Sequence, residues 1–473
     1  MVRTKLVAVL LGPTGVGLVG IYQSVVGLVG TLAGLGIGQS AVRQVAEAAN
    51  ADNQEQIGRT VRVLRRVCWI TGCLGTLLTA ALAWPLSVWM FGHGERAWPI
   101  AILGVTVLLG NISGGQMALI QGIRRIGDIA RVQVLSIFAG TIISVVLYAW
   151  FRERGIVPVL VVSALINLGI SWWFARRVVV PLASVTWLET FTEARGFIAL
   201  GLAFMWSAVV TAGVALATRS LINAKFGMEG NGLYQAAWGV SGVFAGFILG
   251  AMGTDFYPRL TAVADDDDKV NRLVNEQTEV GILLALPGLL ATLVFSPWII
   301  RILYSADFAA AAALLPWFVL GTFGRVISWP MGFIQLAKGS AKWFVASETA
   351  ASFLQLGLVW MGLKWYGMIG VAIAVAALYA VHIVAVLCIA RHLSRFAWSK
   401  SVLNLLFVTG TLVAGTFLLT TFASELPTTV VGGFIALASG FFSLRRICRR
   451  LGQHHRVSKV LLRLPILGQC FVS

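Results

Sequence analysis

The chain alternates between long apolar runs and short breaks that are rich in charged residues, glycine or proline. Most runs reach 18 residues or more, which lets an α-helix cross a hydrocarbon core about 30 Å thick. The expected helices cover 1–11, 15–38, 64–91, 98–120, 132–151, 156–175, 197–221, 231–253, 278–303, 309–336, 343–363, 367–390, 402–422 and 428–444. This pattern predicts an all-α polytopic membrane protein with about fourteen transmembrane helices, the first of them truncated.

The first run is too short to span a membrane. Its apolar stretch from Leu6 to Leu11 covers only about 9 Å at 1.5 Å per residue. No small-residue cleavage site follows the basic start, so the sequence does not predict a signal peptide. We expect a first helix that is shortened either by a misassigned start at Met1 or by real loss. Sequencing of the mature N-terminus distinguishes these alternatives.

Lysine and arginine gather in the breaks after even-numbered helices and in the tail, for example at 59–66, 124–131 and 445–463. The positive-inside rule then places both termini in the cytoplasm and explains the net charge of +17 without a nucleic-acid partner. The tail is either a solvated anchor or an amphipathic segment on the anionic leaflet. The acidic run at 265–268 is expected to be a solvated loop. Five cysteines without a CxxC or metal spacing predict no disulfide framework and no metal site. No cofactor is expected either.

An internal repeat connects the two halves of the chain. Gly12, Gly15 and Gly17 recur as Gly227, Gly230 and Gly232 at an offset of 215 residues. The register continues through the helices, because Gln121 pairs with Gln335 at an offset of 214. Two six-helix repeats in the same orientation predict a pseudo-twofold axis along the membrane normal, with a substrate path between the lobes. The expected lobes are 1–180 and 195–393, followed by two extra helices in 400–445 and a basic cytoplasmic tail, 446–473.

Glycine and proline mark the candidate hinges of a moving transporter. The glycines of the repeat favour tight turns and close helix approach. Pro287 and Pro330 are expected to break their helices, a feature that moving transporters share with static bundles. The hinge candidates are Gly12, Pro13, Gly15, Gly227, Gly230 and Pro330.

Charged residues inside predicted spans are candidates for substrate binding, because a charge at mid-bilayer costs roughly 2.5–3.5 kcal/mol on insertion scales. Arg325 lies mid-helix and is the clearest case. The full substrate-binding set is Arg3, Lys5, Arg43, Arg219, Arg259, Arg325, Gln121 and Gln335. If they all face the cleft, the cavity is cationic.

Each of these residues also has a structural interpretation. Arg43 and Arg259 fit inner-face anchors equally well. Arg219 is open to snorkelling outward, and Arg325 to pairing with a carboxylate. The two glutamines fit an interhelical hydrogen-bond pair. Arg3 and Lys5 are simple N-terminal anchors if Met1 is native.

Two carboxylates, Asp255 and Glu348, are candidates for binding a coupling proton or cation. Asp255 precedes Arg259 by one helical turn, so an i,i+4 ion pair is an equally good interpretation. No nucleotide-binding motif is present, and a proton or sodium gradient is therefore the expected energy source.

The sequence resembles the Wzx-type O-antigen and oligosaccharide flippases of the multidrug/oligosaccharidyl-lipid/polysaccharide exporter superfamily over nearly its whole length. The most similar stretches are LLGPTGVGLVGIYQSVVGLVGTLAGLGIGQSAVRQVAE and DFYPRLTAVADDDDKVNRLVNEQTE. The resemblance implies that undecaprenyl-diphosphate-linked oligosaccharide is moved across the bacterial inner membrane by alternating access. By similarity to lipid II flippases, Arg3 or Lys5, Arg43 and Arg259 take the roles of their arginines. The short first helix departs from the family. The implied partners are the lipid-linked glycan, membrane lipids and the polysaccharide polymerase machinery.

Two other classes of protein compete with this interpretation. A multidrug cation antiporter of the same superfamily favours acidic residues in its cavity, whereas the intramembrane charges here are mostly arginine. A glycan polymerase or ligase needs a sizeable outer loop for its chemistry, and every predicted outer break is short. The sequence therefore predicts a transporter and not an enzyme.

Overall fold

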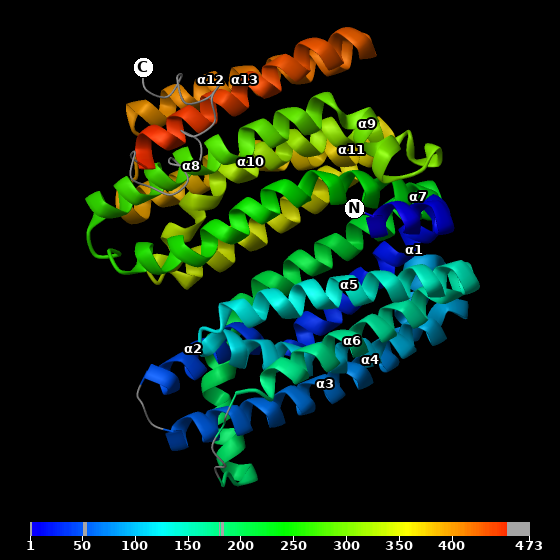
Figure 1. Ribbon diagram of the computed structural model, residues 1–473, viewed down its shortest axis with the longest axis vertical. Helices are drawn as coiled ribbons and strands as arrows, with labels where there is room; N and C mark the ends of the chain where they lie inside the picture. The colour runs from blue at the N-terminus through cyan, green and yellow to red at the C-terminus, as the bar shows by residue number, and fades with distance from the viewer. Residues whose placement is uncertain (1, 51–53, 179, 181–183, 452–473) are drawn as a thin grey trace. The chain divides into compact units, whose positions relative to one another are not determined.

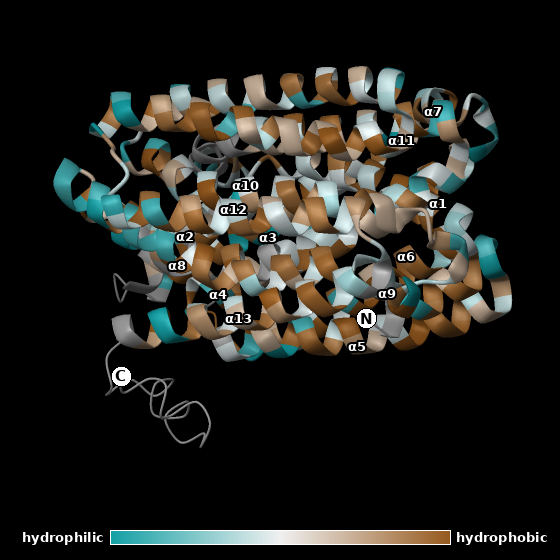
Figure 2. Ribbon diagram, turned by 90° about the horizontal axis from the view of Figure 1, so that it is seen from above, coloured by the Kyte–Doolittle hydropathy of each residue, from teal (hydrophilic) through white to brown (hydrophobic). Residues whose placement is uncertain are grey.

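The computed structural model describes residues 2–50, 54–178, 180 and 184–451, and this part of the chain is helical without any strand. Ten of the described helices are long and apolar enough to cross a membrane. Hydrophobic residues cover the middle of these helices, and hydrophilic residues gather near their ends (Figure 2). The predicted all-α polytopic class is therefore confirmed, while the exact number of fourteen spans stays a prediction.

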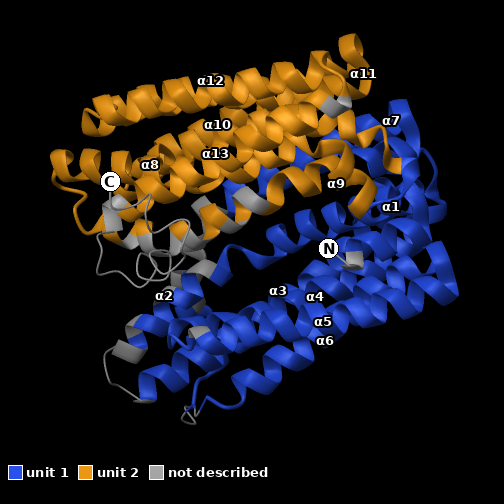
Figure 3. Ribbon diagram, turned by 45° about the horizontal axis from the view of Figure 1, so that its top comes forward, with its two compact units in different colours: residues 1–235, 303–307 blue, residues 236–302, 308–473 orange. Residues whose placement is uncertain are grey.

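The chain forms two compact units, residues 1–235 with 303–307 and residues 236–302 with 308–473 (Figure 3). The boundary at 235 lies inside a long helix, so 205–235 packs with the N-terminal helices. The predicted six-helix lobes, 1–180 and 195–393, stay a prediction.

The first unit contains the helices up to the middle of α7 (Figure 1). They are α1 (Val2–Gly34), α2 (Ile37–Asn50), α3 (Gln54–Phe91), η1 (Gly94–Arg96), α4 (Ala97–Gly122), α5 (Ile126–Phe151), η2 (Arg152–Gly155), α6 (Ile156–Ala175) and α7 (Trp187–Thr261). Helix α4 packs against both α3 and α6. Small residues allow this approach, and the Thr76 hydroxyl donates a 2.9 Å hydrogen bond to the carbonyl of Gly104.

The later helices build most of the second unit. They are α8 (Asp267–Val294), α9 (Ser296–Leu303), η3 (Ala306–Phe308), α10 (Ala311–Ala337), α11 (Ala341–Ser394), α12 (Lys400–Phe422) and α13 (Glu425–Leu451). Helix α10 packs along α11, and α8 contacts α10, α12 and α13 (Figure 1). The two helices outside the repeat, α12 and α13, are thus held to the second unit through α8.

Among the described residues, three long helices contain a glycine with positive φ that divides them. These residues are Gly12 in α1, Gly227 in α7 and Gly367 in α11, with φ of 63°, 67° and 62°. A straight helix of 75 residues, the length of α7, measures about 110 Å, far more than a bilayer. The break at Gly227 therefore separates what the sequence predicts as two helices, 197–221 and 231–253.

Several boundaries differ from the prediction. Polar helix α2 follows a turn at 35–36 in a stretch that was expected to be a loop, and α3 begins ten residues before 64. The prediction that Pro287 and Pro330 break their helices is wrong, because α8 and α10 continue through them. A proline removes one backbone donor, and neighbouring helices can compensate for that loss.

A capping box starts α7, and two arginines of α3 bind the same first turns of the helix. The backbone N–H of Thr186 donates to Glu189 at 2.7 Å, and the N–H of Glu189 donates to the Thr186 hydroxyl at 3.3 Å. Arg59 forms ion pairs with Glu189 and Glu193 at 3.2 and 3.1 Å. Arg66 donates to the Thr190 hydroxyl at 2.8 Å. The backbone hydrogen bond from Thr186 is the main cause that lowers the pKa of Glu189, and the Thr186 hydroxyl and Arg59 add to it.

Candidate functional site

The two repeats make the same turn at their first break. Gly12 has φ 63° and ψ −175°, and Gly227 has φ 67° and ψ −168°, a conformation that L side chains rarely adopt. A Cβ added at Gly15 would lie 2.5 Å from Cβ of Leu11, and one at Gly230 would lie 2.5 Å from Cβ of Phe226. Each pair corresponds at the 215-residue offset, so the repeat is visible in backbone geometry.

The turns also contact each other reciprocally within the first unit. A Cβ added at Gly17 would lie 2.2 Å from the carbonyl oxygen of Met228, and one at Gly232 would lie 2.0 Å from that of Pro13. Pro13 corresponds to Met228, and Gly17 to Gly232, at an offset of 215. Such an exchange of equivalent contacts is what a local twofold relation produces. Only glycine permits this backbone approach, whereas the hinge role of the turns stays a prediction.

Arg219 is a buried cation beside the second turn. Its side chain is 8% exposed, and its guanidinium donates a 2.5 Å hydrogen bond to the Gln235 side-chain oxygen. It also lies over the ring of Tyr234, 5.3 Å from the centroid. A Cβ at Gly20 would lie 3.5 Å from Nε of Arg219, so α1 lies directly against the cation. This burial argues against the snorkelling interpretation.

Hydrogen bonds across Gly227 show that α7 folds back on itself. Arg219 and Gln235 are 16 residues apart, which is about 24 Å along a straight helix. Asn231 donates a 3.1 Å bond to the Arg219 carbonyl across 12 residues. On the other side, Asn223 donates a 2.6 Å bond to the Met90 carbonyl at the end of α3. The cation is therefore held in a hydrogen-bonded hairpin.

In the second unit, Arg325 lies near the middle of α10, about 20 Å from either helix end at 1.5 Å per residue. Its side chain is exposed. Arg325 and Glu348 both interact electrostatically with Tyr379 of α11, and the ring of Tyr379 packs against His382 at 6.0 Å between centroids. The structure thus collects a cation, a carboxylate, a phenol and an imidazole on neighbouring spanning helices.

The remaining described candidates are spread over the units. Gln335 is 2% exposed and accepts a 3.0 Å hydrogen bond from the Ser347 hydroxyl. Gln121, its partner in the repeat, is exposed at the end of α4. Arg259 is also exposed. The ammonium of Lys5 donates to the carbonyl of Tyr304. The glutamines therefore differ in environment despite their equivalent positions.

Burial raises the pKa of Tyr304, the partner of Lys5, to about 12, so its phenol remains neutral at physiological pH.

Three of the candidate residues predicted from the sequence cannot be placed. The side chains of Arg3, Arg43 and Asp255 lie outside the described residues.

An apolar groove runs between α8 and α13 of the second unit. Its volume is about 640 Å³, and its wall includes Gly288, Phe295, Gly433 and Leu437. No charged side chain lines it among the described residues. Outside the groove, Arg446 of α13 donates a 2.8 Å bond to Glu279 of α8 and another of 2.8 Å to Ser401 of α12. This ion pair fixes the extra helices to α8.

Sequence reasoning missed Gln235, Tyr234 and Asn231 as partners of the Arg219 hairpin. The available signal was the spacing around Gly227, because Arg219 and Gln235 stand eight residues before and after it. Two helices that leave a tight turn bring such positions together.

Comparisons with known proteins point to one family. Residues 6–313 match the family described as "Polysaccharide biosynthesis protein". The Lipid III flippase of Escherichia coli (strain K12) is 25% identical over 400 residues, covering 80% of this chain and 90% of that protein. The Lipid III flippase of Shigella flexneri gives the same values.

Solved structures are similar in fold. An inward-facing multidrug resistance transporter of the MATE family and MOP superfamily has a TM-score of 0.68 at 16% identity, covering 83% of this chain and 94% of its own. The lipid II flippase MurJ in an inward closed conformation has a TM-score of 0.62 at 13% identity, covering 92% and 97%. At these identities the likeness concerns the fold alone.

Proposed function

The chain belongs to the polysaccharide biosynthesis protein family, and from that membership we propose that it flips an undecaprenyl-diphosphate-linked oligosaccharide across the bacterial inner membrane. The resemblance drawn from the sequence is confirmed at the level of this family. The cargo is a repeat unit of O-antigen or a similar surface polysaccharide, and transport proceeds by alternating access of the two lobes. The protein performs no covalent chemistry on its cargo.

The observation that carries the proposal is the accessible guanidinium of Arg325 near the middle of spanning helix α10. A charge at this depth is unfavourable against lipid and stable in a water-filled path or beside an opposite charge. A diphosphate supplies that opposite charge, since its oxygens accept charge-assisted hydrogen bonds from arginine. We therefore assign Arg325 to binding of the lipid-linked diphosphate as it passes.

Further cations extend the path in this proposal. Buried Arg219 stands eight residues before the turn at Gly227 in α7, and Lys5 lies near the N-terminus of α1. Arg3, Arg43 and Arg259 complete the cationic set expected from the sequence. Gln121 and Gln335 contribute only as polar neighbours.

The lipid tail needs a separate, apolar place. The α8–α13 groove of about 640 Å³ has no charged lining in the described part of the chain, and α13, one of its two helices, lies outside the repeat. Small residues such as Gly433 keep it open, and a polyprenyl chain fits this chemistry. We assign the extra helices to binding of the lipid tail, and the two lobes to binding of the diphosphate and glycan.

Glu348 is proposed as the coupling carboxylate, because it shares the Tyr379 environment with Arg325. A bound proton or cation at Glu348 changes the local charge that Arg325 experiences, which links ion binding to release of the diphosphate. Asp255 is the second candidate. The turns at Gly12 and Gly227 and the position of Pro330 remain the proposed hinges.

Orientation follows from the loop charges. Both termini face the cytoplasm in this proposal, since the basic breaks and tail lie on one side by the positive-inside rule. Membrane lipids and the polysaccharide polymerase machinery are the proposed partners. A multidrug cation antiporter is not favoured, because the curated relatives are lipid III flippases and the charge at mid-membrane is positive.

Deletion of the gene, followed by extraction of inner-membrane glycolipids, tests the proposal in cells. We expect a complete undecaprenyl-linked repeat unit to accumulate, and the native gene but not Arg325→Gln to relieve it. Arg177→Gln, which removes an exposed arginine at the end of α6, is the matched control and is expected to complement. Unchanged glycolipids with altered drug sensitivity would contradict the proposal.

A further inference from the structure

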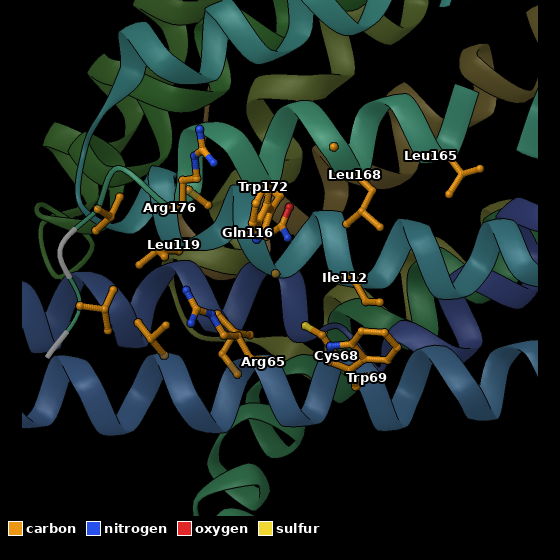
Figure 4. A pocket seen from close by; sticks show the side chains of 17 residues that line it. Arg65, Cys68, Trp69, Ile112, Gln116, Leu119, Leu165, Leu168, Trp172 and Arg176 are labelled. Carbon is orange, nitrogen blue, oxygen red and sulfur yellow. The ribbon is translucent and has the colours of Figure 1, made fainter. Parts of the chain in front are cut away.

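A second cavity lies inside the first unit, between α3, α4 and α6. Its volume is about 740 Å³, which is within the usual range for ligand pockets. Arg65 and Arg176 lie toward one end, and Ile112 and Leu165 toward the other (Figure 4). Among the described residues, none of those proposed for transport lines it, so the inference that follows does not rest on the proposed function.

The basic end is cationic without a compensating carboxylate. Arg65 and Arg176 are both exposed, and no aspartate or glutamate lines the cavity among the described residues. Other arginines of α3 have partners, since Arg59 pairs with Glu189 and Arg66 donates a hydrogen bond to Thr190. Arg65 makes no such bond in the described part of the chain. Two guanidinium groups are thus available to an anion.

The rest of the lining is apolar and aromatic. Trp69 is 54% exposed, Trp172 is 55% exposed, and Leu165 is 48% exposed. The guanidinium of Arg176 lies over the ring of Trp172 at 5.1 Å. All three large side chains belong to helices that are apolar enough to span a membrane. Trp172 and Arg176 stand at the end of α6, and tryptophan together with arginine at a span's end is typical of the level of lipid headgroups.

The cavity also has room for an acyl chain. Gly169 of α6 lies on its wall, and a Cβ added there would meet no atom within 4 Å. A glycine at this position keeps the wall open where a larger side chain would fill the space.

We propose that this cavity binds one phospholipid with an anionic headgroup. The phosphate accepts hydrogen bonds from Arg65 and Arg176, and an acyl chain follows the apolar wall past Trp69 toward Leu165. Basic pockets between spanning helices suit anionic headgroups, and arginine matches the geometry of phosphate oxygens. The bound lipid fills the gap between α3 and α6 and so stabilises the first unit.

Native mass spectrometry of the purified full-length chain tests this site. Phosphatidylglycerol is titrated against phosphatidylcholine, and retained lipids are counted. The double variant Arg65→Gln/Arg176→Gln is expected to weaken phosphatidylglycerol binding by about 30-fold, because each basic residue near an anionic surface contributes roughly 1 kcal/mol. Phosphatidylcholine, which carries no net charge, should bind the native chain more weakly.

Two further variants keep the test decisive. Gly169→Phe fills the cavity, leaves both arginines in place, and is expected to abolish the tight site. Arg177→Gln is the matched control, since Arg177 lies over Trp173 at 4.1 Å and does not line the cavity. It is expected to retain one phosphatidylglycerol like the native chain.

Equal binding of phosphatidylglycerol by the native chain and by both cavity variants would overturn the proposal. Retention of the lipid-linked glycan instead of phosphatidylglycerol would also overturn it, since that result makes the cavity part of the transport path. Loss of lipid binding without loss of transport would leave the proposed function intact and separates the two claims.

Discussion

The reciprocal glycine contact gives a sharp prediction about stability. Gly232→Ala would place its Cβ 2.0 Å from the carbonyl oxygen of Pro13, and Gly17→Ala would place one 2.2 Å from that of Met228. Atoms at these positions need at least about 3.0 Å, so the turns must separate by nearly 1 Å in either variant. Both contacts are backbone to backbone, and no flexible side chain can yield.

The expected loss is large for so small a change. Overpacking a tight contact costs roughly 1–3 kcal/mol. By the local twofold relation, Gly17→Ala and Gly232→Ala should be destabilised to a similar extent. Gly110→Ala in α4 is the matched control, because a Cβ there meets no atom within 4 Å. It should be neutral or slightly stabilising, since alanine favours a helix over glycine.

Thermal unfolding of the purified variants in one detergent measures this effect. We expect both contact variants to melt several degrees below the native protein, at roughly 2–4 °C per kcal/mol, and the control to melt at or above it. Equal melting temperatures for the separate variants Gly232→Ala and Gly110→Ala would refute the close approach of the turns. A strong effect of one contact variant alone would refute the reciprocal arrangement.

Three other perturbations test separate contacts. Arg446→Ala removes the 2.8 Å bond to Glu279 and should lower the free energy of unfolding by roughly 1–3 kcal/mol. Adding Glu279→Gln should recover part of this loss, because it removes the carboxylate left without its partner. Equal free energies of unfolding for the single and double variants would contradict this coupling. Gly367→Ala must adopt φ of 62° and should cost roughly 1–2 kcal/mol in the same assay, and an unchanged melting temperature would show that the turn is not left-handed. Folding lowers the pKa of Glu189, so its contribution is present above its ordinary pKa near 4.5 and is lost as the pH falls through the folded value. The melting difference between native protein and Glu189→Gln should therefore shrink below about pH 4.5, and a difference that stays constant from pH 3 to 7 would contradict the capping box.

The repeat could be predicted from the sequence because glycines that must adopt positive φ or permit backbone contact cannot be replaced without strain. Gly12 and Gly227 are both glycine for that reason. They stand 215 residues apart, and their conformations agree within about ten degrees. Hydropathy predicted the all-α membrane class, since every span must satisfy its own backbone in lipid. These features depend on local chemistry and can be read from one chain.

Tertiary partners were not predictable in the same way. Gln235 became the partner of Arg219 only because α7 reverses at Gly227, and hydropathy does not distinguish a tight reversal from a short loop. Pro287 and Pro330 were expected to break their helices, yet α8 and α10 continue through them. The cavity at Arg65 and Arg176 depends on how three helices meet, which no local pattern encodes.

Translocation in proteoliposomes tests the central claim most directly. Purified native protein and Arg325→Gln are reconstituted with a fluorescent polyprenyl-diphosphate-linked oligosaccharide, and transfer between leaflets is followed by its accessibility to a quencher. We predict transfer by the native protein and a rate about 10- to 100-fold lower for Arg325→Gln, the effect of losing one charge-assisted contact of roughly 1.5–3 kcal/mol. Arg325→Lys should lie between them, because lysine keeps the charge and loses the bidentate geometry. Native protein that transfers no glycolipid, or Arg325→Gln that transfers it at the native rate, would contradict the account.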